Sequence, residues 1–333
     1  MTTLVGRVPS RLWVALAALV PLASLTFWAP TFWVSIATQA LIFAIFAMSI
    51  DLLLGFGGLP SFGHAGFYGA GSYACAYFAL RAVHDVWLLL LVGMAVSALL
   101  ALPIGALSLR ARGIYFLMLT LAFGQMLWGY AQQSPRDFLG GSDGLIGVQR
   151  PALEWLAAFD RTLWELTGAE ARLPAIRNFY NFTLILAVAA FTILAGVVSS
   201  PFGRTLEGIR ENENRMRAMG TPTFRYQLAA FVVAGALAGL AGTLATLFNG
   251  FANSGELFWT NSGLVLIAAI VGGTRSLIGP ALGAFLVLII QDSLSSLSER
   301  WPLILGAVFI GFVIFLPGGL ASAGRTLTSL RRR

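Results

Sequence analysis

Apolar runs of membrane-spanning length follow one another along most of the chain, separated by short polar or glycine-rich stretches. A helix needs about 20 predominantly apolar residues to cross a bilayer. Runs of this kind are predicted at residues 12–28, 31–54, 62–80, 86–109, 113–133, 178–200, 226–248, 262–273, 276–297 and 301–318. The run at 262–273 is short, so a re-entrant segment and a thin or broken crossing are both open. The pattern predicts an all-α polytopic membrane protein with about ten transmembrane helices, including short or broken ones.

The same pattern divides the chain into consecutive segments. Residues 1–11 form an N-terminal tail, 12–133 hold the first five helices, 134–177 form a polar loop, and 178–200 form the sixth helix. Residues 201–225 are a charged segment, 226–321 hold the seventh to tenth helices, and 322–333 form a basic tail. Arg7 and Arg11 before the first run are also typical of a secretory signal. No clear small-x-small cleavage site follows that run, so a retained span is predicted.

The composition excludes several classes of protein. Hydrophobic residues make up 58% of the 333 and charged residues 11%, which leaves too little polar surface for a soluble enzyme or a disordered chain. The 21 residues counted as Lys or Arg are all Arg, so a P-loop lysine and a Schiff base are excluded. The single cysteine, Cys75, cannot form an intrachain disulfide. The two histidines, His64 and His84, fall on opposite predicted sides, so no metal site is predicted.

Charge is distributed unevenly between the loops. With ten crossings both termini lie on one side, and that side carries 14 of the 21 Arg and 4 of the 14 acidic residues. The positive-inside rule then predicts that both termini and segment 201–225 are cytoplasmic and that loop 134–177 is external. A net charge of +7 in so apolar a chain indicates orientation in a membrane rather than nucleic-acid binding.

The charged segment reads PFGRTLEGIRENENRMRAMGTPTFR and predicts one short amphipathic helix, from Pro201 to a stop at Gly220 and Pro222. Apolar side chains recur near one face, at Phe202, Leu206, Ile209, Met216 and Met219. Charges of alternating sign at i,i+4 spacing, Glu211 with Arg215 and Glu213 with Arg217, suit a protein groove better than a lipid surface. The spans hold no carboxylate–histidine relay, so we expect energy for transport to come from a partner that contacts this segment.

Polar residues inside or beside the spans are candidates for a translocation path. The Gly-rich stretch 55–61 breaks the chain before the third span, and irregular backbone at membrane depth must face protein or a water-filled cavity. Helix packing and hydrogen bonding between helices are the alternative, particularly since small residues recur at four-residue spacing, as in Gly71 with Cys75 and Gly235 with Gly239. The path candidates are Ser61, Gly63, His64, Thr120 and Gln125.

Five ordered blocks of sequence carry a resemblance to a known family. They are GGLPSFGHAGFYGAGSY at 57–73, LRARGIYFLMLTLAFGQ at 109–125, GGSDGL at 140–145, GRTLEGIRENENRMRAMG at 203–220 and IVGGTRSLIGPALGA at 270–284. Together they resemble the M-type inner-membrane permease of branched-chain amino acid ABC importers. The resemblance covers about residues 31–320, and relatives within the family carry urea or short amides instead.

The resemblance implies a multi-pass subunit of the bacterial inner membrane that supplies half of a transmembrane path and performs no bond chemistry. It implies four kinds of partner: a second, homologous permease, two cytoplasmic ATPase subunits that hold ATP and Mg, an extracytoplasmic substrate-binding protein, and membrane lipid. No cofactor is expected on this chain, and no nucleic acid is expected as a partner. It also implies that the charged segment is the coupling helix that contacts an ATPase. The residues expected to carry this coupling are Leu206, Glu207, Ile209, Arg210, Glu211, Arg215, Met216, Met219 and Gly220.

The external loop contains a second motif. Gly140–Gly144 fits the G-x-S-x-G pattern of serine hydrolases, with Ser142 as nucleophile and His84 as the one plausible base on that side. An intramembrane hydrolase is therefore a remote alternative function, and an ion-coupled carrier that works alone is another. A structural turn, or a surface at Gly141, Ser142 and Asp143 that receives the binding protein, is the other interpretation of the loop.

Overall fold

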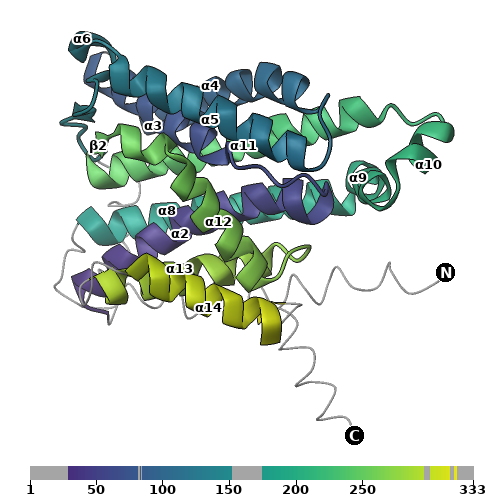
Figure 1. Ribbon diagram of the computed structural model, residues 1–333. Coiled ribbons are helices and arrows are strands. Elements are labelled where there is room, and N and C mark those ends of the chain that lie inside the picture. Colours follow the sequence, from purple (N-terminus) through teal and green to yellow (C-terminus); the bar gives the residue numbers. More distant parts are fainter. Residues whose placement is uncertain are drawn as a thin grey trace, which may run out of the picture.

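The computed structural model describes residues 29–81, 83, 85–151, 175–295, 301–315 and 319–320. The expected first span at 12–28 and residues 152–174 of loop 134–177 lie outside the described residues. So does His84. The described chain is almost entirely helical (Figure 1), in agreement with the predicted all-α membrane class.

Six helical stretches of the described chain are long and apolar enough to cross a membrane. They are α2 with η1 (Thr31–Asp51 and Leu52–Phe56), α4 (Val86–Ser108), α5 (Ile114–Gln133), α8 (Ala175–Ser199), α11 (Thr223–Asn249) and α13 (Ile278–Ser295). Three further helices are shorter or less apolar: α3 (His64–Arg81), α12 (Trp259–Gly272) and α14 (Trp301–Phe315). A multi-pass membrane protein is therefore established, while the count of about ten spans and the side of the termini stay predictions.

Two helices lie at the centre of the bundle. α11 packs against α3, α4 and α2, and α2 packs in turn against α8 and α13. Nearly every residue of α11 from Ala234 to Phe248 is buried, and alanine and glycine predominate there. Small side chains let helix backbones approach closely, which replaces the hydrophobic driving force that lipid removes. The outer helices α4, α5 and α13 leave large apolar side chains exposed, as a lipid-facing surface requires.

The two ends of the bundle carry different structures. The short helices α9 (Pro201–Glu211) and α10 (Glu213–Ala218) lie at one end, and α6 (Arg136–Leu139) lies at the other (Figure 1). Beside α6, β1 (Leu145–Ile146) pairs antiparallel with β2 (Phe251–Ala252), Leu145 opposite Ala252. This two-stranded ribbon ties the loop after α5 to the connection between α11 and α12. It is a small departure from the predicted all-α fold.

The break before the third span differs in form from the prediction. α2 does not simply stop near residue 54, because it passes at Asp51 into a π-helix, η1, over Leu52–Phe56. The wider turn is shown by the bond from the Gly57 N–H to the Leu52 carbonyl at 3.1 Å, and the Leu59 N–H then closes the end of the helix by bonding to the Leu53 carbonyl at 2.9 Å. The chain then runs without regular structure to His64, where α3 begins.

Candidate functional site

The charged segment folds as two helices rather than the predicted single helix. α9 ends at Glu211 because Asn212 adopts an extended conformation, with φ −159° and ψ 94°. The Asn212 side chain then caps α10 by accepting the Arg215 N–H at 2.9 Å. Asparagine is among the strongest N-cap residues, so its local hydrogen bond overrides the helical pattern on either side. The chain leaves α10 through Gly220, whose φ of +82° is the left-handed conformation expected at a helix end.

The break separates charges that the single helix would have paired. Glu213 and Arg217 form the predicted i,i+4 ion pair, with Oε1 and Nη2 2.5 Å apart. Arg112, from the connection between α4 and α5, lies 3.5 Å from the same carboxylate. Glu211 and Arg215 lie on different helices and form no ion pair with each other within the described residues. α10 is thus held to the body of the protein through Glu213.

The apolar face predicted along the whole segment is confined to α9. Leu206 and Ile209 are both buried, and Leu206 joins the core of the bundle, whereas Met219 is 65% exposed. Met216 folds back onto α9, where a Cβ on Gly208 would lie 3.0 Å from its sulfur. Glu207 reaches from α9 to Arg275 on the connection between α12 and α13, and Arg210 reaches to the Gly55 carbonyl of the π-helix. The segment therefore presents an inner face fixed to the bundle and an outer face, with Glu211, Arg215 and Met219, that is free to contact another protein.

Three of the five path candidates come together where the chain crosses α5. The Phe62 N–H donates to Thr120 Oγ1 at 3.3 Å, and a Cβ on Gly63 would lie 2.9 Å from the Thr120 carbonyl carbon. Ser61 is buried beside this crossing, and its hydroxyl has no partner in the described chain. Thr120 itself donates to the Leu117 carbonyl at 2.9 Å. The crossing needs glycine at position 63, because any larger side chain would meet the α5 backbone.

The other two candidates point elsewhere. His64 faces α2, where Nε2 lies 2.8 Å from Ser49 Oγ and the ring stacks on Phe46 with centroids 5.4 Å apart. Gln125 is further along α5, and its Nε2 is buried without a hydrogen-bond partner among the described residues. The structure thus brings Ser61, Gly63 and Thr120 together and places His64 in a separate, packed environment.

The loop at the opposite end from α9 forms a tight glycine turn. Gly140, Gly141 and Gly144 all have positive φ, and the turn leads directly into β1. The exposed Ser142 hydroxyl donates to Asp143 Oδ1 at 3.3 Å. A hydrolase of this motif needs its serine between a strand and a helix. Here the serine precedes a strand, so the turn lacks that geometry.

A half-buried carboxylate near the same end was missed by the sequence analysis. Glu256 lies on η2 (Ser254–Leu257), between α11 and α12, and accepts a hydrogen bond from Ser72 in the middle of α3. Ser72 also lies 2.6 Å from the hydroxyl of Thr246 on α11. Burial raises the pKa of the Glu256 carboxyl to about 8, and the hydrogen bond from Ser72 opposes part of that rise. In the sequence, residues 249–261 are a short connection between two predicted spans, and nothing in it indicates burial. The folded structure packs this connection against α3.

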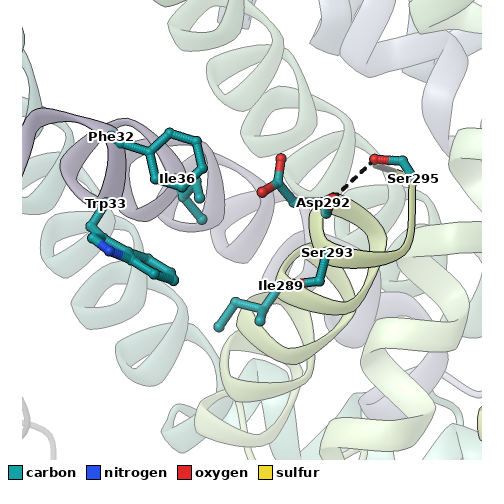
Figure 2. Close-up of a pocket in the computed structure, with 7 residues that line it drawn as sticks. All are labelled: Phe32, Trp33, Ile36, Ile289, Asp292, Ser293 and Ser295. Atoms are coloured by element: carbon teal, nitrogen blue, oxygen red, sulfur yellow. Dashed lines mark hydrogen bonds between the residues drawn. The ribbon is translucent and has the colours of Figure 1, made fainter. Parts of the chain in front are cut away.

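A cavity of about 580 Å³ opens between the N-terminal end of α2 and the C-terminal end of α13. Figure 2 shows Phe32, Trp33 and Ile36 facing Ile289 and Asp292 across it. None of the predicted path, coupling or docking residues lines this cavity. Within the described ranges, no three His, Cys, Asp or Glu residues are grouped so that they could hold a metal ion.

Comparison with known proteins adds the evidence of descent. A family model described as "Branched-chain amino acid transport system / permease component" matches residues 32–316. The high-affinity branched-chain amino acid transport system permease protein LivM of Escherichia coli K12 is 28% identical over 311 residues, covering 90% of this chain and 72% of its own length. The autoinducer 2 import system permease protein LsrC of Photorhabdus laumondii is 33% identical over 144 residues, 40% of this chain and 41% of its own. No solved structure matches the chain.

Proposed function

Because this chain belongs to the family of permease components of branched-chain amino acid transport systems, we propose that it forms half of the translocation path of an ATP-driven importer for branched-chain, hydrophobic amino acids. The single observation that carries the proposal is the relationship to LivM over 90% of the chain. The chain is a transport subunit rather than an enzyme, and ATP is hydrolysed on partner subunits.

The arrangement of the bundle supports this role. The charged helices α9 and α10 lie at one end, and the glycine turn and the β1–β2 ribbon lie at the other (Figure 1). The end with α9 carries most of the described Arg residues, among them Arg110, Arg112, Arg217 and Arg275. By the positive-inside rule this end faces the cytoplasm of a bacterial inner membrane and receives the ATPases. The ribbon end then receives the substrate-binding protein, through Gly141, Ser142 and Asp143.

A complete path needs a second permease subunit. The exposed, apolar faces of the outer helices offer surface both to this subunit and to lipid. In the proposed cycle, closure of the two ATPases displaces α9 and α10 and switches the path around Ser61 and Thr120 between outward and inward access. No cofactor is needed on this chain, since ATP and Mg bind to the partners.

The test is reconstitution of the assembly. The tagged chain is purified from its native membranes in mild detergent, and the proteins that travel with it are identified by mass spectrometry. They are then incorporated into proteoliposomes with the binding protein outside and ATP inside, and uptake of radiolabelled leucine and urea is measured. We expect ATP-dependent leucine uptake. Uptake of urea in its place would assign the chain to the amide-carrying relatives, and uptake by the lone chain without ATP would overturn the proposal.

A double variant tests the coupling segment directly. Glu211→Arg reverses a charge on the outer face, and Gly220→Pro imposes φ near −65° where the chain has +82°. We expect normal insertion but roughly tenfold lower uptake for the same ATP hydrolysis, equal to about 1.4 kcal/mol of coupling. Asp137→Arg at the opposite end is the matched charge reversal and should leave the ratio of uptake to hydrolysis unchanged. Normal uptake in the double variant would count against the segment as the lever.

A further inference from the structure

The π-helix at the end of α2 has an orphaned carbonyl. In an α-helix the Gly55 carbonyl would accept the N–H of Leu59, and in a π-helix that of residue 60. The Leu59 N–H instead donates to the Leu53 carbonyl at 2.9 Å, and Pro60 has no N–H to give. Such C-terminal carbonyls carry the negative end of the helix dipole and favour a cation.

Arg210 on α9 supplies that cation. Its Nη1 donates to the Gly55 carbonyl, so the guanidinium caps the π-helix from a different element of the fold. Its aliphatic stem lies across Gly58, where a Cβ would be 2.7 Å from Arg210 Cγ. Gly58 has a φ of +67°, the conformation glycine adopts most readily. One side chain of α9 therefore touches both ends of the turn that leaves α2.

A second contact from α9 reaches the connection between α12 and α13. Glu207 Oε1 lies 3.9 Å from the guanidinium of Arg275, which has a φ of +69°. The backbone N–H of Arg275 donates to Asp51 Oδ1 at 3.1 Å, and Asp51 is the residue at which α2 becomes the π-helix. Gly55 fits between these groups, since a Cβ there would lie 2.8 Å from the Arg275 nitrogen. α9, the π-helix and the α12–α13 connection thus meet at one joint.

The irregular segment beyond the π-helix continues from this joint to the crossing with α5. The Phe62 N–H bonds to Thr120 on α5, and the Ala65 N–H bonds to Ser262 Oγ on α12 at 2.8 Å. Displacement of the Gly55 turn must therefore be taken up between the joint and these two anchors, in residues 56–61. That stretch contains Ser61, one of the predicted path candidates.

We propose that Arg210 is the positioning residue that transmits movement of α9 to the π-helix of α2, and through it to the segment around Ser61. The Glu207–Arg275 contact is the second branch of the same joint and carries the movement to α12 and α13. The inference rests on the proposed function, because it assigns the route by which an ATPase-driven displacement would reach the path. Arg210 acts through the backbone of Gly55 and touches no cargo.

The test compares Arg210→Ala, Arg210→Lys and wild type in the reconstituted importer. We expect uptake per ATP hydrolysed by the assembled complex to fall about tenfold in Arg210→Ala, within the range typical of coupling between sites. Lysine keeps the stem and the charge but not the planar fork, so an intermediate ratio is expected. Arg110→Ala, an exposed arginine at the same end, is the control and should keep the wild-type ratio.

A second measurement separates transmission from simple stabilisation. In a Cys75→Ala background, Leu59→Cys places one thiol on the turn, and its rate of reaction with a maleimide is compared without nucleotide and in the vanadate-trapped state. The rate of maleimide labelling should change on vanadate trapping when Arg210 is present and should stay constant in Arg210→Ala. An unchanged ratio of uptake to ATP in Arg210→Ala, or loss of ATPase binding, would overturn the proposal. Failure of wild type to import with ATP would instead reject the proposed function, and the inference would fall with it.

Discussion

Replacing Gly71 by alanine is expected to leave little correctly folded protein. Gly71 lies where α3 crosses α11, and a Cβ there would be 2.5 Å from the Gly239 Cα and 2.7 Å from its carbonyl carbon. Both are backbone atoms and cannot move aside as a flexible side chain would. On the opposite helix, a Cβ on Gly242 would lie 2.7 Å from the Tyr68 carbonyl carbon. The two helices can therefore accommodate the extra methyl group only by moving apart.

Separation would also break the hydrogen bonds that depend on this approach. Thr243 Oγ1 donates to the Gly71 carbonyl at 3.3 Å, and the Ser72 and Thr246 hydroxyls are 2.6 Å apart. Overpacking costs about 1–3 kcal/mol, and each lost hydrogen bond adds roughly 1 kcal/mol. We expect Gly71→Ala to lower the free energy of unfolding by about 3 kcal/mol or more. The measurements are the monodisperse fraction in size-exclusion chromatography and the unfolding midpoint in detergent.

Two other helical glycines provide the matched control. A Cβ on Gly129 of α5 or Gly196 of α8 meets no atom within 4 Å. Alanine is a better helix former than glycine by up to about 1 kcal/mol, so Gly129→Ala and Gly196→Ala should be neutral or slightly stabilising. If Gly71→Ala had the same yield and unfolding midpoint as Gly129→Ala and Gly196→Ala, α3 and α11 could not approach each other as closely as the structure shows.

The spans themselves could be predicted from sequence with good accuracy. The run at 86–109 became α4 (Val86–Ser108) and the run at 113–133 became α5 (Ile114–Gln133). A long apolar run in lipid must form a helix, because unpaired backbone N–H and C=O groups are costly there and a helix pairs them within the segment. The small-residue pairs at Gly71 and Gly235–Gly239 also indicated close packing. That Gly71 meets Gly239 is a property of the assembled bundle.

The predictions that failed concern local hydrogen bonds. One helix over the charged segment was expected from spacing, and Asn212 divided it because a side-chain cap competes with the helical pattern. In the π-helix at Leu52–Phe56 each backbone hydrogen bond spans five residues instead of four. The segment is as apolar as the α-helix before it, so hydropathy does not distinguish the two. The inward bond from the Arg210 guanidinium to the Gly55 carbonyl was also not predicted, while the ATPase contact expected of the exposed Arg210 stays a prediction. That inward bond depends on an orphaned carbonyl far away along the chain.

The burial of Glu256 also depends on a contact that the sequence does not reveal, and it makes the stability of the protein depend on pH. A glutamate carboxyl ordinarily has a pKa of 4.5, whereas that of Glu256 has a pKa of about 8 in the folded protein, because burial against α3 disfavours the ionised form. Between these values the folded chain holds a proton that the unfolded chain releases. Raising the pH through this interval therefore favours unfolding, and the contribution to stability, complete below pH 4.5, is lost as the pH approaches 8.

Replacing Glu256 by glutamine should remove this dependence. Glutamine resembles the protonated acid in size and neutrality, so folding near pH 6 should be preserved. For wild type we expect the free energy of unfolding to fall between about pH 5.5 and 7.5 by up to about 1.4 kcal/mol per pH unit more than for Glu256→Gln. The measurement is a reversible mixed-detergent titration at several pH values. Subtracting the free energy of unfolding of Glu256→Gln from that of wild type at each pH removes the contributions of all other titrating groups, which the two proteins share.

The exposed acid Asp137, at the same end of the bundle, distinguishes burial from charge alone. Asp137→Asn removes one negative charge as Glu256→Gln does, but its side chain lies in solvent. It should therefore keep the pH slope of wild type. Parallel slopes for wild type and Glu256→Gln would show that Glu256 is already ionised near pH 6. The Ser72–Glu256 contact would then hold a carboxylate rather than a protonated acid.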